Sequence, residues 1–337
     1  GEPLRSPEAV AERLLAVQGQ DPRGARLAVR ARTVGVSAAD VDRALTVDRS
    51  LLITWLNRGT LHLVRSEDYP WLQALTTPPL RTSATRRLRQ EGVGEKDTER
   101  AVRIIEKALA EEGPQTRVQL RERLERKKVP TAGQALIHLL FLAAVRGIAV
   151  RGPMVGNQHA YALVRDWLGE PQPVDRERAL AELARRYLVG HGPADDRDLA
   201  RWAGLPLRDA RAGLSAIAGG LEQRPDGLVD LSKRPAAEPL PPPRLLGAYD
   251  PLLLGWTSRE EVVGPHQILV TNNGLFRPFA LVKGRAVARW GLSGGKVTIE
   301  HLGKVTKKDT AALEEDAQRV LEFMEMPSPR KASNSDA

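Results

Sequence analysis

The sequence predicts an α+β protein in which three helical modules, each closed by a β-hairpin, precede a small antiparallel β-domain. Three segments repeat one order of elements, in which a short helix, a second helix and a longer helix lead into a hairpin. This order is typical of winged-helix modules, whose third helix enters a DNA groove while the hairpin flanks it. After a proline-rich run, the apolar period changes from 3.6 residues to 2, which indicates strands.

The middle segment shows the repeated order most clearly. An amphipathic helix over 98–113 precedes a second helix, for which Thr116 is a candidate cap. A third helix is expected from a cap at Thr131 to a stop at Gly147. Two alternating strands follow around a loop at 154–158, and they form the predicted hairpin.

The third segment repeats this order, and the first segment repeats it more loosely. In the third, three helices lead to a hairpin whose turn is Asp226-Gly227, a strong turn signal. In the first, we expect helices over 7–21, 37–45 and 49–59, and a strand over 60–64.

The last part of the chain is predicted as a connector, a sheet and a closing helix. A proline-rich run is expected to be a stiff linker. Alternating strands then turn at Asn273-Gly274, Lys283-Gly284 and Gly294-Gly295, which predicts a barrel-like antiparallel domain. A helix capped at Asp309 or Thr310 closes it.

These boundaries give six predicted parts of the chain. The three winged-helix modules cover 1–80, 81–168 and 169–232, and the linker covers 233–247. The β-domain with its closing helix covers 248–326, and a disordered tail covers 327–337.

Composition restricts the function. The chain has 337 residues, with 51 Lys and Arg against 42 Asp and Glu, so its net charge is +9. Such a surplus favours a polyanionic partner, although free use of arginine by a genome would produce it too. The absence of Cys excludes disulfides, thiolate metal sites and Cys nucleophiles, and we expect no metal or cofactor. No apolar stretch is long enough to span a membrane and no export signal is visible, so we expect a cytoplasmic monomer.

The motifs of common nucleotide-binding enzymes and hydrolases are missing from the sequence. No glycine loop for phosphate, no dinucleotide fingerprint and no nucleophile elbow is present. The residues alone therefore indicate a protein that binds double-stranded DNA through several winged helices, such as a regulator. A protein-interaction scaffold is the alternative.

One local pattern suggests chemistry. Gln18 and Gln20 flank a glycine where an apolar helix ends, so that two carboxamides can point at one water molecule. Arg23, Arg26 and Arg30 follow, within reach of phosphates. The plain alternative is that the two glutamines are polar loop residues.

Four longer motifs resemble the AlkZ/YcaQ family of bacterial DNA glycosylases, and the resemblance runs from about residue 7 to about residue 325. The motifs are "VQGQDPRGARLAVRAR", "LLITWLNRGTLHLV", "YDPLLLGW" and "TNNGLFRPFALVKGRAVARW". The resemblance implies three tandem winged helices and a β-barrel, which form a C-shaped basic channel around duplex DNA. It also implies that Gln18 and Gln20 are the catalytic pair, although Gly19 occupies a position that is usually aliphatic.

The same resemblance implies the reaction. The family hydrolyses the N-glycosidic bond of N-alkylated purines, chiefly N7-alkylguanine. AlkZ-type members, to which this sequence is most similar, also unhook interstrand crosslinks and give an azinomycin producer its self-resistance. Because such a base is already cationic, it leaves without the acid that most glycoside hydrolysis requires. Two carboxamides can then position a water molecule, although neither can act as a general base.

Further candidates surround this motif. Asp21 is a candidate base, or else a residue that terminates a helix. His62 lies on a predicted strand and is expected to take part in chemistry, to contact DNA, or to be structural. Arg58 and Thr60 are candidate phosphate ligands at an exposed helix end. Three more residues near hairpin tips are candidates for DNA contact or simply solvated turns, namely Arg277, Lys283 and Arg285.

Overall fold

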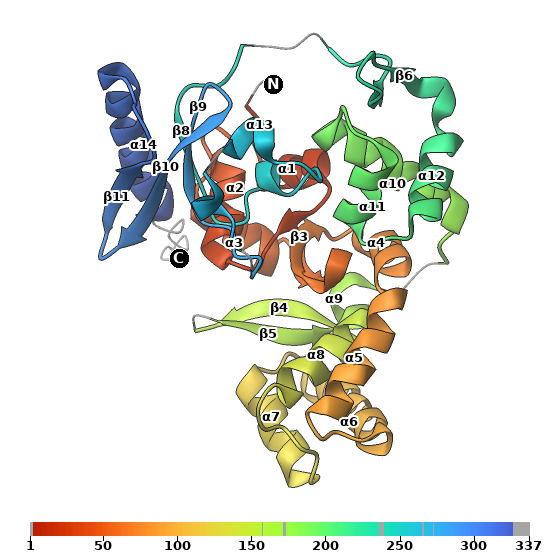
Figure 1. The fold of residues 1–337 in the computed structure, drawn as a ribbon. Helices are drawn as coiled ribbons and strands as arrows, with labels where there is room; N and C mark the ends of the chain where they lie inside the picture. The colour runs from red at the N-terminus through yellow and green to blue at the C-terminus, as the bar shows by residue number, and fades with distance from the viewer. Residues whose placement is uncertain are drawn as a thin grey trace, which may run out of the picture.

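The computed structural model describes residues 3–325 except 157, 171–172, 236–238, 265 and 272 (Figure 1). The predicted disordered tail over 327–337 lies outside the described residues. Among the described residues, no helix combines the length and the apolar character that crossing a bilayer demands.

The N-terminal region contains three helices and three strands. They are α1 (Pro7–Leu14), β1 (Val17–Gln18), α2 (Pro22–Arg30), α3 (Ala38–Thr46), β2 (Leu51–Trp55) and β3 (Leu61–Arg65), with the 3-10 turn η1 (Asn57–Gly59) between β2 and β3. The helix predicted over 49–59 is wrong, because this segment forms β2 and η1. All five residues of β2 are buried, so its apolar run lacks the alternation that separates a strand from a buried helix.

The second region follows the predicted order of helices and hairpin. It contains α4 (Tyr69–Thr76), α5 (Pro78–Gln90), α6 (Glu95–Glu112), α7 (Arg117–Arg126), α8 (Ala135–Val145), β4 (Ala149–Val155), β5 (Gln158–Leu163) and α9 (Val164–Leu168). Thr116 caps α7 in a reciprocal capping box with Gln119, as predicted for Thr116. Thr131 does not cap α8, because its hydroxyl bonds Glu125 and the helix begins four residues later.

The first two regions share one antiparallel sheet, with the strand order β1-β3-β2-β4-β5. The two hairpins meet where Ile53 on β2 pairs with Arg151 on β4. Helix α8 packs into the apolar core beside this sheet, and eight of its residues are buried. The sequence did not indicate this joint sheet.

The third region keeps the predicted order. It contains α10 (Arg176–His191), α11 (Asp196–Ala203), α12 (Leu207–Ala216), β6 (Leu221–Gln223) and β7 (Val229–Leu231). The hairpin turns at Asp226-Gly227, as predicted, with Gly227 at φ 86°. Stacked and tilted rings of this region pack together with Trp256 of the C-terminal region. We call them the aromatic cluster, and its members are Tyr187, His191, Trp202 and Trp256.

The C-terminal region is an open sheet with a helix, not a closed barrel. Its antiparallel strands run in the order β11-β10-β9-β8, over Lys296–His301, Arg285–Ser293, Phe279–Val282 and Arg244–Leu246, and the short helix α13 (Glu260–Val263) and the long α14 (Lys307–Glu325) accompany them (Figure 1). The predicted turns at Lys283-Gly284 and Gly294-Gly295 join these strands. The expected barrel is wrong, because four strands form an open sheet. The predicted linker is shorter than expected because β8 lies within it.

The closing helix α14 begins earlier than predicted. Its first residue is Lys307, and the hydroxyl of Thr306 accepts a hydrogen bond of 3.1 Å from the backbone N–H of Asp309. Thr306 therefore supplies the cap that was predicted at Asp309 or Thr310.

Helix α2 is locked against the C-terminal region, which fixes the segment that carries the glutamine motif. A Cβ on Gly24 would lie 2.3 Å from the backbone oxygen of Ala248, so the two backbones touch. Beyond α2, Arg32 donates two hydrogen bonds of 2.9 and 2.8 Å to the fully buried Asp250. The motif "YDPLLLGW" thus has a structural role beside α2.

Candidate active site

The glutamine motif lies on the outer strand of the joint sheet. Helix α1 ends at Leu14, and the buried Leu15 turns the chain with φ 64° into β1. Gln18 pairs with His62 on β3, and the N–H of Gly19 donates to the Leu61 carbonyl at 2.7 Å. Gln18 is 6% exposed, whereas Gln20 just beyond the strand is exposed.

Both carboxamides have their oxygen atoms fixed by donors. Arg58 Nη2 lies 3.4 Å from Gln18 Oε1, and the backbone N–H of Leu61 lies 3.3 Å from Gln20 Oε1. Because a guanidinium and a backbone N–H only donate, the atom facing each of them must be the oxygen. Each NH2 group is therefore turned away from these partners.

Arg58 is held by the third region rather than presented to solvent. It sits in η1 with φ 59°, and its Nη1 donates to the carbonyls of Trp202 and of Arg201, the latter at 3.4 Å. These carbonyls lie at the C-terminal end of α11, where a cation is favoured. Burial, together with the neighbouring Arg201 and Arg259, lowers the pKa of Arg58 to about 10, so it stays charged at pH 7. The predicted phosphate contact of Arg58 therefore stays a prediction, and the geometry favours a role in orienting Gln18.

Thr60 is half-buried and has a local role. Its hydroxyl donates to the Asn57 carbonyl at 3.3 Å, and its own carbonyl faces the ring of His62. The predicted phosphate contact of Thr60 has no support in these contacts.

His62 is buried on the same face as Gln18. It is 2% exposed, and its Nδ1 lies 2.9 Å from the Thr60 carbonyl. Burial and the nearby Arg58 cation lower the pKa of His62 to about 3, so the ring is neutral at pH 7. Burial argues against the alternative in which His62 contacts DNA directly.

Asp21 caps a helix. Its carboxylate accepts a 3.0 Å hydrogen bond from the backbone N–H of Arg23, and Pro22 occupies the first position of α2. This arrangement is a standard helix start, and it gives Asp21 a structural role beside the motif.

The three arginines of α2 have different environments. Arg23 is exposed and donates to the Leu292 carbonyl at 3.0 Å, while Arg26 pairs with Asp42. Arg30 is buried, where it donates hydrogen bonds of 3.1 and 2.8 Å to Asp316. The prediction that Arg30 binds DNA is therefore corrected, because its guanidinium joins α2 to α14.

A cationic pocket of about 430 Å³ begins at the start of α2, directly after the glutamine motif. Four guanidinium groups contribute to it, and no Asp or Glu is among the residues that line it. We call it the cationic pocket, and its basic members are Arg23, Arg26, Arg117 and Arg151. Sequence reasoning missed Arg117 and Arg151, because only the joint sheet brings α7 and β4 beside α2.

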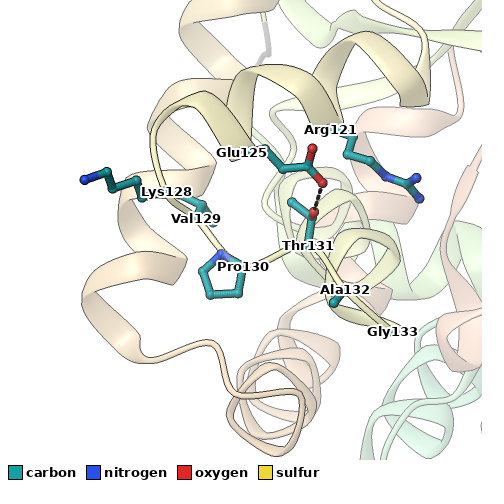
Figure 2. Close-up of a pocket in the computed structure, with 8 residues that line it drawn as sticks. All are labelled: Arg121, Glu125, Lys128, Val129, Pro130, Thr131, Ala132 and Gly133. Carbon is teal, nitrogen blue, oxygen red and sulfur yellow. Dashed lines mark hydrogen bonds between the residues drawn. The ribbon is translucent and has the colours of Figure 1, made fainter.

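The turn between α7 and α8 forms another cavity, of about 580 Å³ (Figure 2). Arg121 and Lys128 line it, and the hydroxyl of Thr131 donates to Glu125 at 2.5 Å across the turn. All of its lining residues fall within 121–133, so this cavity does not include the glutamine motif.

The basic residues of the C-terminal region lie on exposed turns and strand ends. Arg277, Lys283 and Arg285 are exposed, and Arg285 lies 3.8 Å from Glu261. The structure thus brings Gln18, Gln20, Arg58, Thr60 and His62 together around β1 and β3. Arg277, Lys283 and Arg285 lie instead at the ends of the strands β9 and β10, in a separate sheet.

Comparison with known proteins decides the family, since residues 11–323 match a family model described as DNA glycosylase AlkZ-like. The chain belongs to the AlkZ-like family of DNA glycosylases. The predicted family and enzyme class are confirmed.

A sequence match and a structural match both relate this AlkZ-like glycosylase to Streptomyces sahachiroi. The chain is 29% identical to an interstrand DNA cross-link repair glycosylase, over 95% of this chain and 91% of that protein. It also matches the solved structure of the DNA glycosylase AlkZ with a TM-score of 0.77 and 24% identity, covering 96% of this chain and 91% of that one. The structural match supports the mixed helix and sheet fold.

Proposed function

We propose that this AlkZ-like glycosylase hydrolyses the N-glycosidic bond of N7-alkylguanine in duplex DNA, and that Gln18 and Gln20 position the attacking water. The observation that carries the proposal is the fixed orientation of the two carboxamides at the end of β1. Their oxygen atoms are bound by Arg58 and by the Leu61 N–H, so their NH2 groups are available to a water molecule.

The chemistry suits neutral side chains. An N7-alkylated guanine carries a positive charge, so breaking the glycosidic bond neutralises the leaving base and needs no acid. What remains is to place water and to stabilise the positive charge that develops on the sugar, and both are tasks of positioning and electrostatics. The motif contains no lysine to form a Schiff base, so the product is an abasic site in an intact strand.

DNA binding is assigned to the repeated helical regions. The helix order followed by a hairpin in each of the first three regions supports three winged-helix modules, arranged as a C-shaped basic channel around duplex DNA. The cationic pocket lies directly beyond the glutamine motif and suits phosphates of the damaged strand. The exposed Arg277, Lys283 and Arg285 suit further contacts with the DNA backbone. We expect a monomer to be sufficient.

Bulky lesions and interstrand crosslinks are included in the proposed substrate range. Gln20 is exposed rather than enclosed in a tight base pocket, so a base need not be fully extruded to reach it. The name of the relative from S. sahachiroi, an interstrand DNA cross-link repair glycosylase, supports this extension.

The test is release of free base from a duplex that contains N7-methylguanine. We expect wild-type protein to release 7-methylguanine, and Gln18→Ala with Gln20→Ala to lower the single-turnover rate by about a hundredfold or more while duplex affinity stays within about threefold. Gln90→Ala, which removes an exposed carboxamide on α5, is the matched control. A double variant with wild-type turnover would refute the site, and a panel of crosslinked duplexes tests the wider range.

A further inference from the structure

A row of polar side chains crosses the joint sheet on the face of Gln18. Thr54 on β2 and Gln18 on β1 are both register partners of His62 on β3, so the three side chains point to the same face. Antiparallel partners alternate between two kinds of pair, and the bond from the Gly19 N–H to the Leu61 carbonyl makes Gln18 and His62 a pair without mutual backbone bonds. Side chains in such pairs are close, with Cβ atoms about 4.5–5.5 Å apart.

The tautomer of His62 follows from its hydrogen bond. The Thr60 carbonyl can only accept, so the proton of the neutral ring resides on Nδ1 and Nε2 carries a lone pair. Nε2 has no hydrogen-bond partner in the described part of the chain, and it is not among the fully enclosed polar atoms without partners. Burial and Arg58 lower the pKa of His62 to about 3, which keeps this lone pair free of a proton at neutral pH.

The glutamine pair alone orients a water molecule incompletely. Each Oε1 already accepts one hydrogen bond from the protein, and the open side of each carboxamide is an NH2 donor. Each donor occupies one of the two lone pairs of the water oxygen, so one NH2 group can hold the water while the second lone pair points at the sugar. A hydrogen atom of that water then requires an acceptor. Nε2 of His62 is an acceptor beside Gln18 that no described group uses.

We propose that Nε2 of His62 accepts a hydrogen bond from the attacking water and thereby aims its free lone pair at the anomeric carbon. This inference rests on the proposed glycosylase reaction at Gln18 and Gln20. The water oxygen forms a bond to the anomeric carbon, the bond from that carbon to the alkylated base breaks, and its electron pair neutralises the base. The surplus proton passes to bulk water, because His62 is too weak a base to keep it.

Two substitutions separate the acceptor from the structural contact. His62→Asn keeps a donor where Nδ1 meets the Thr60 carbonyl and removes the acceptor at Nε2. His62→Gln places a carboxamide oxygen near the position of Nε2 and gives up the contact with Thr60. We expect His62→Asn to lower the single-turnover release of 7-methylguanine between about tenfold and a hundredfold, and His62→Gln to stay within about fivefold of wild type.

The controls distinguish this role from a structural one. His138→Asn, on a half-buried helical histidine, should leave the rate unchanged, and duplex affinity should be equal in all variants. Equal losses in His62→Asn and His62→Gln, or a wild-type rate in His62→Asn, would overturn the assignment. Nitrogen NMR of His62 gives a readout without activity: we expect the Nδ1–H tautomer from pH 8 to pH 5, and an Nε2–H tautomer would contradict the proposal. Wild-type protein that releases no base would instead refute the proposed function.

Discussion

The sheet edge around Gln18 and the aromatic cluster of the third region each bury a neutral histidine, but in different ways. His62 has one nitrogen on the Thr60 carbonyl and the other open beside polar side chains. His191 stacks on Tyr187 at 5.1 Å between ring centroids and contacts two tryptophans. Both of its nitrogens are enclosed, and no group in the described part of the chain meets the geometry of a hydrogen bond to either. Burial alone therefore does not mark a catalytic histidine. The open nitrogen of His62 within a row of polar side chains is the observation that supports the role we propose for it.

The two regions are physically connected. Arg58 donates to the carbonyl of Trp202, a member of the aromatic cluster, and lies 3.4 Å from Gln18 Oε1. The aromatic cluster thus supports the side chain that contacts Gln18, the residue that we propose positions the attacking water. We therefore expect the enclosed groups to contribute mainly to stability and the open groups to contribute to the proposed reaction.

Lowering the pH should destabilise the fold through both buried histidines, and this loss of stability is the largest effect that we expect. Burial lowers the pKa of His62 to about 3 and of His191 to about 4, whereas both titrate near 6.5 when unfolded. The unfolded chain therefore takes up protons first, and stability that is complete above pH 6.5 is lost as the pH falls towards 4. Between pH 7 and pH 5, each histidine should cost about 2 kcal/mol of unfolding free energy.

Urea unfolding at both pH values measures this loss. His191→Phe keeps an aromatic ring and removes one titrating group, so the difference between pH 7 and pH 5 should shrink by roughly half of the contribution of the two histidines. An unchanged difference would show that His191 is protonated in the folded protein and would break the comparison.

The contrast between enclosed and open groups extends along α2. Arg30→Ala should lower the unfolding free energy by about 3 kcal/mol, because the buried carboxylate of Asp316 would lose its buried guanidinium partner. Arg23→Ala should leave stability within about 0.5 kcal/mol and lower the slope of log affinity for duplex DNA against log salt by about one. Urea denaturation measures the loss of stability in Arg30→Ala, and the salt dependence of duplex binding measures the loss of a phosphate contact in Arg23→Ala. A reduced salt slope in Arg30→Ala would show that Arg30 contacts DNA after all.

Arg58 connects the aromatic cluster to Gln18, and one substitution can displace it directly. A Cβ on Gly204, which has φ 71°, would lie 2.7 Å from the backbone nitrogen of Arg58. Gly204→Ala should therefore cost about 2 kcal/mol of stability and slow base release as Arg58 shifts from Gln18. Gly219→Ala, where nothing lies within 4 Å of the added Cβ, is the control. Normal release in a measurably destabilised Gly204→Ala would show that Arg58 does not orient Gln18.

Local signals predicted much of the fold. The helices α6, α7, α10, α11 and α12 follow from apolar periodicity and caps, and the hairpin at Asp226-Gly227 follows from its turn residues. Strand β2 was mistaken for a helix, because a run of residues buried on both faces has no period. The joint sheet was missed because pairing between distant strands leaves no local pattern in a sequence.

The glutamine pair was found through a family motif, and its surroundings were not. Arg30 and Asp316 are 286 residues apart, so their pairing is visible only in three dimensions. The same holds for Arg58, whose partners in α11 are more than 140 residues away. Sequence reasoning could name His62, but only the Thr60 carbonyl determines which nitrogen carries its proton.

The pairing of β2 with β4 limits how this chain can be divided. A fragment that ends before Ala149 would leave β2 as an uncovered edge, with free N–H and C=O groups and apolar side chains on both faces. Such edges promote aggregation. The first 168 residues should therefore be expressed as one unit rather than as two separate modules, and a domain swap between relatives should keep both hairpins together.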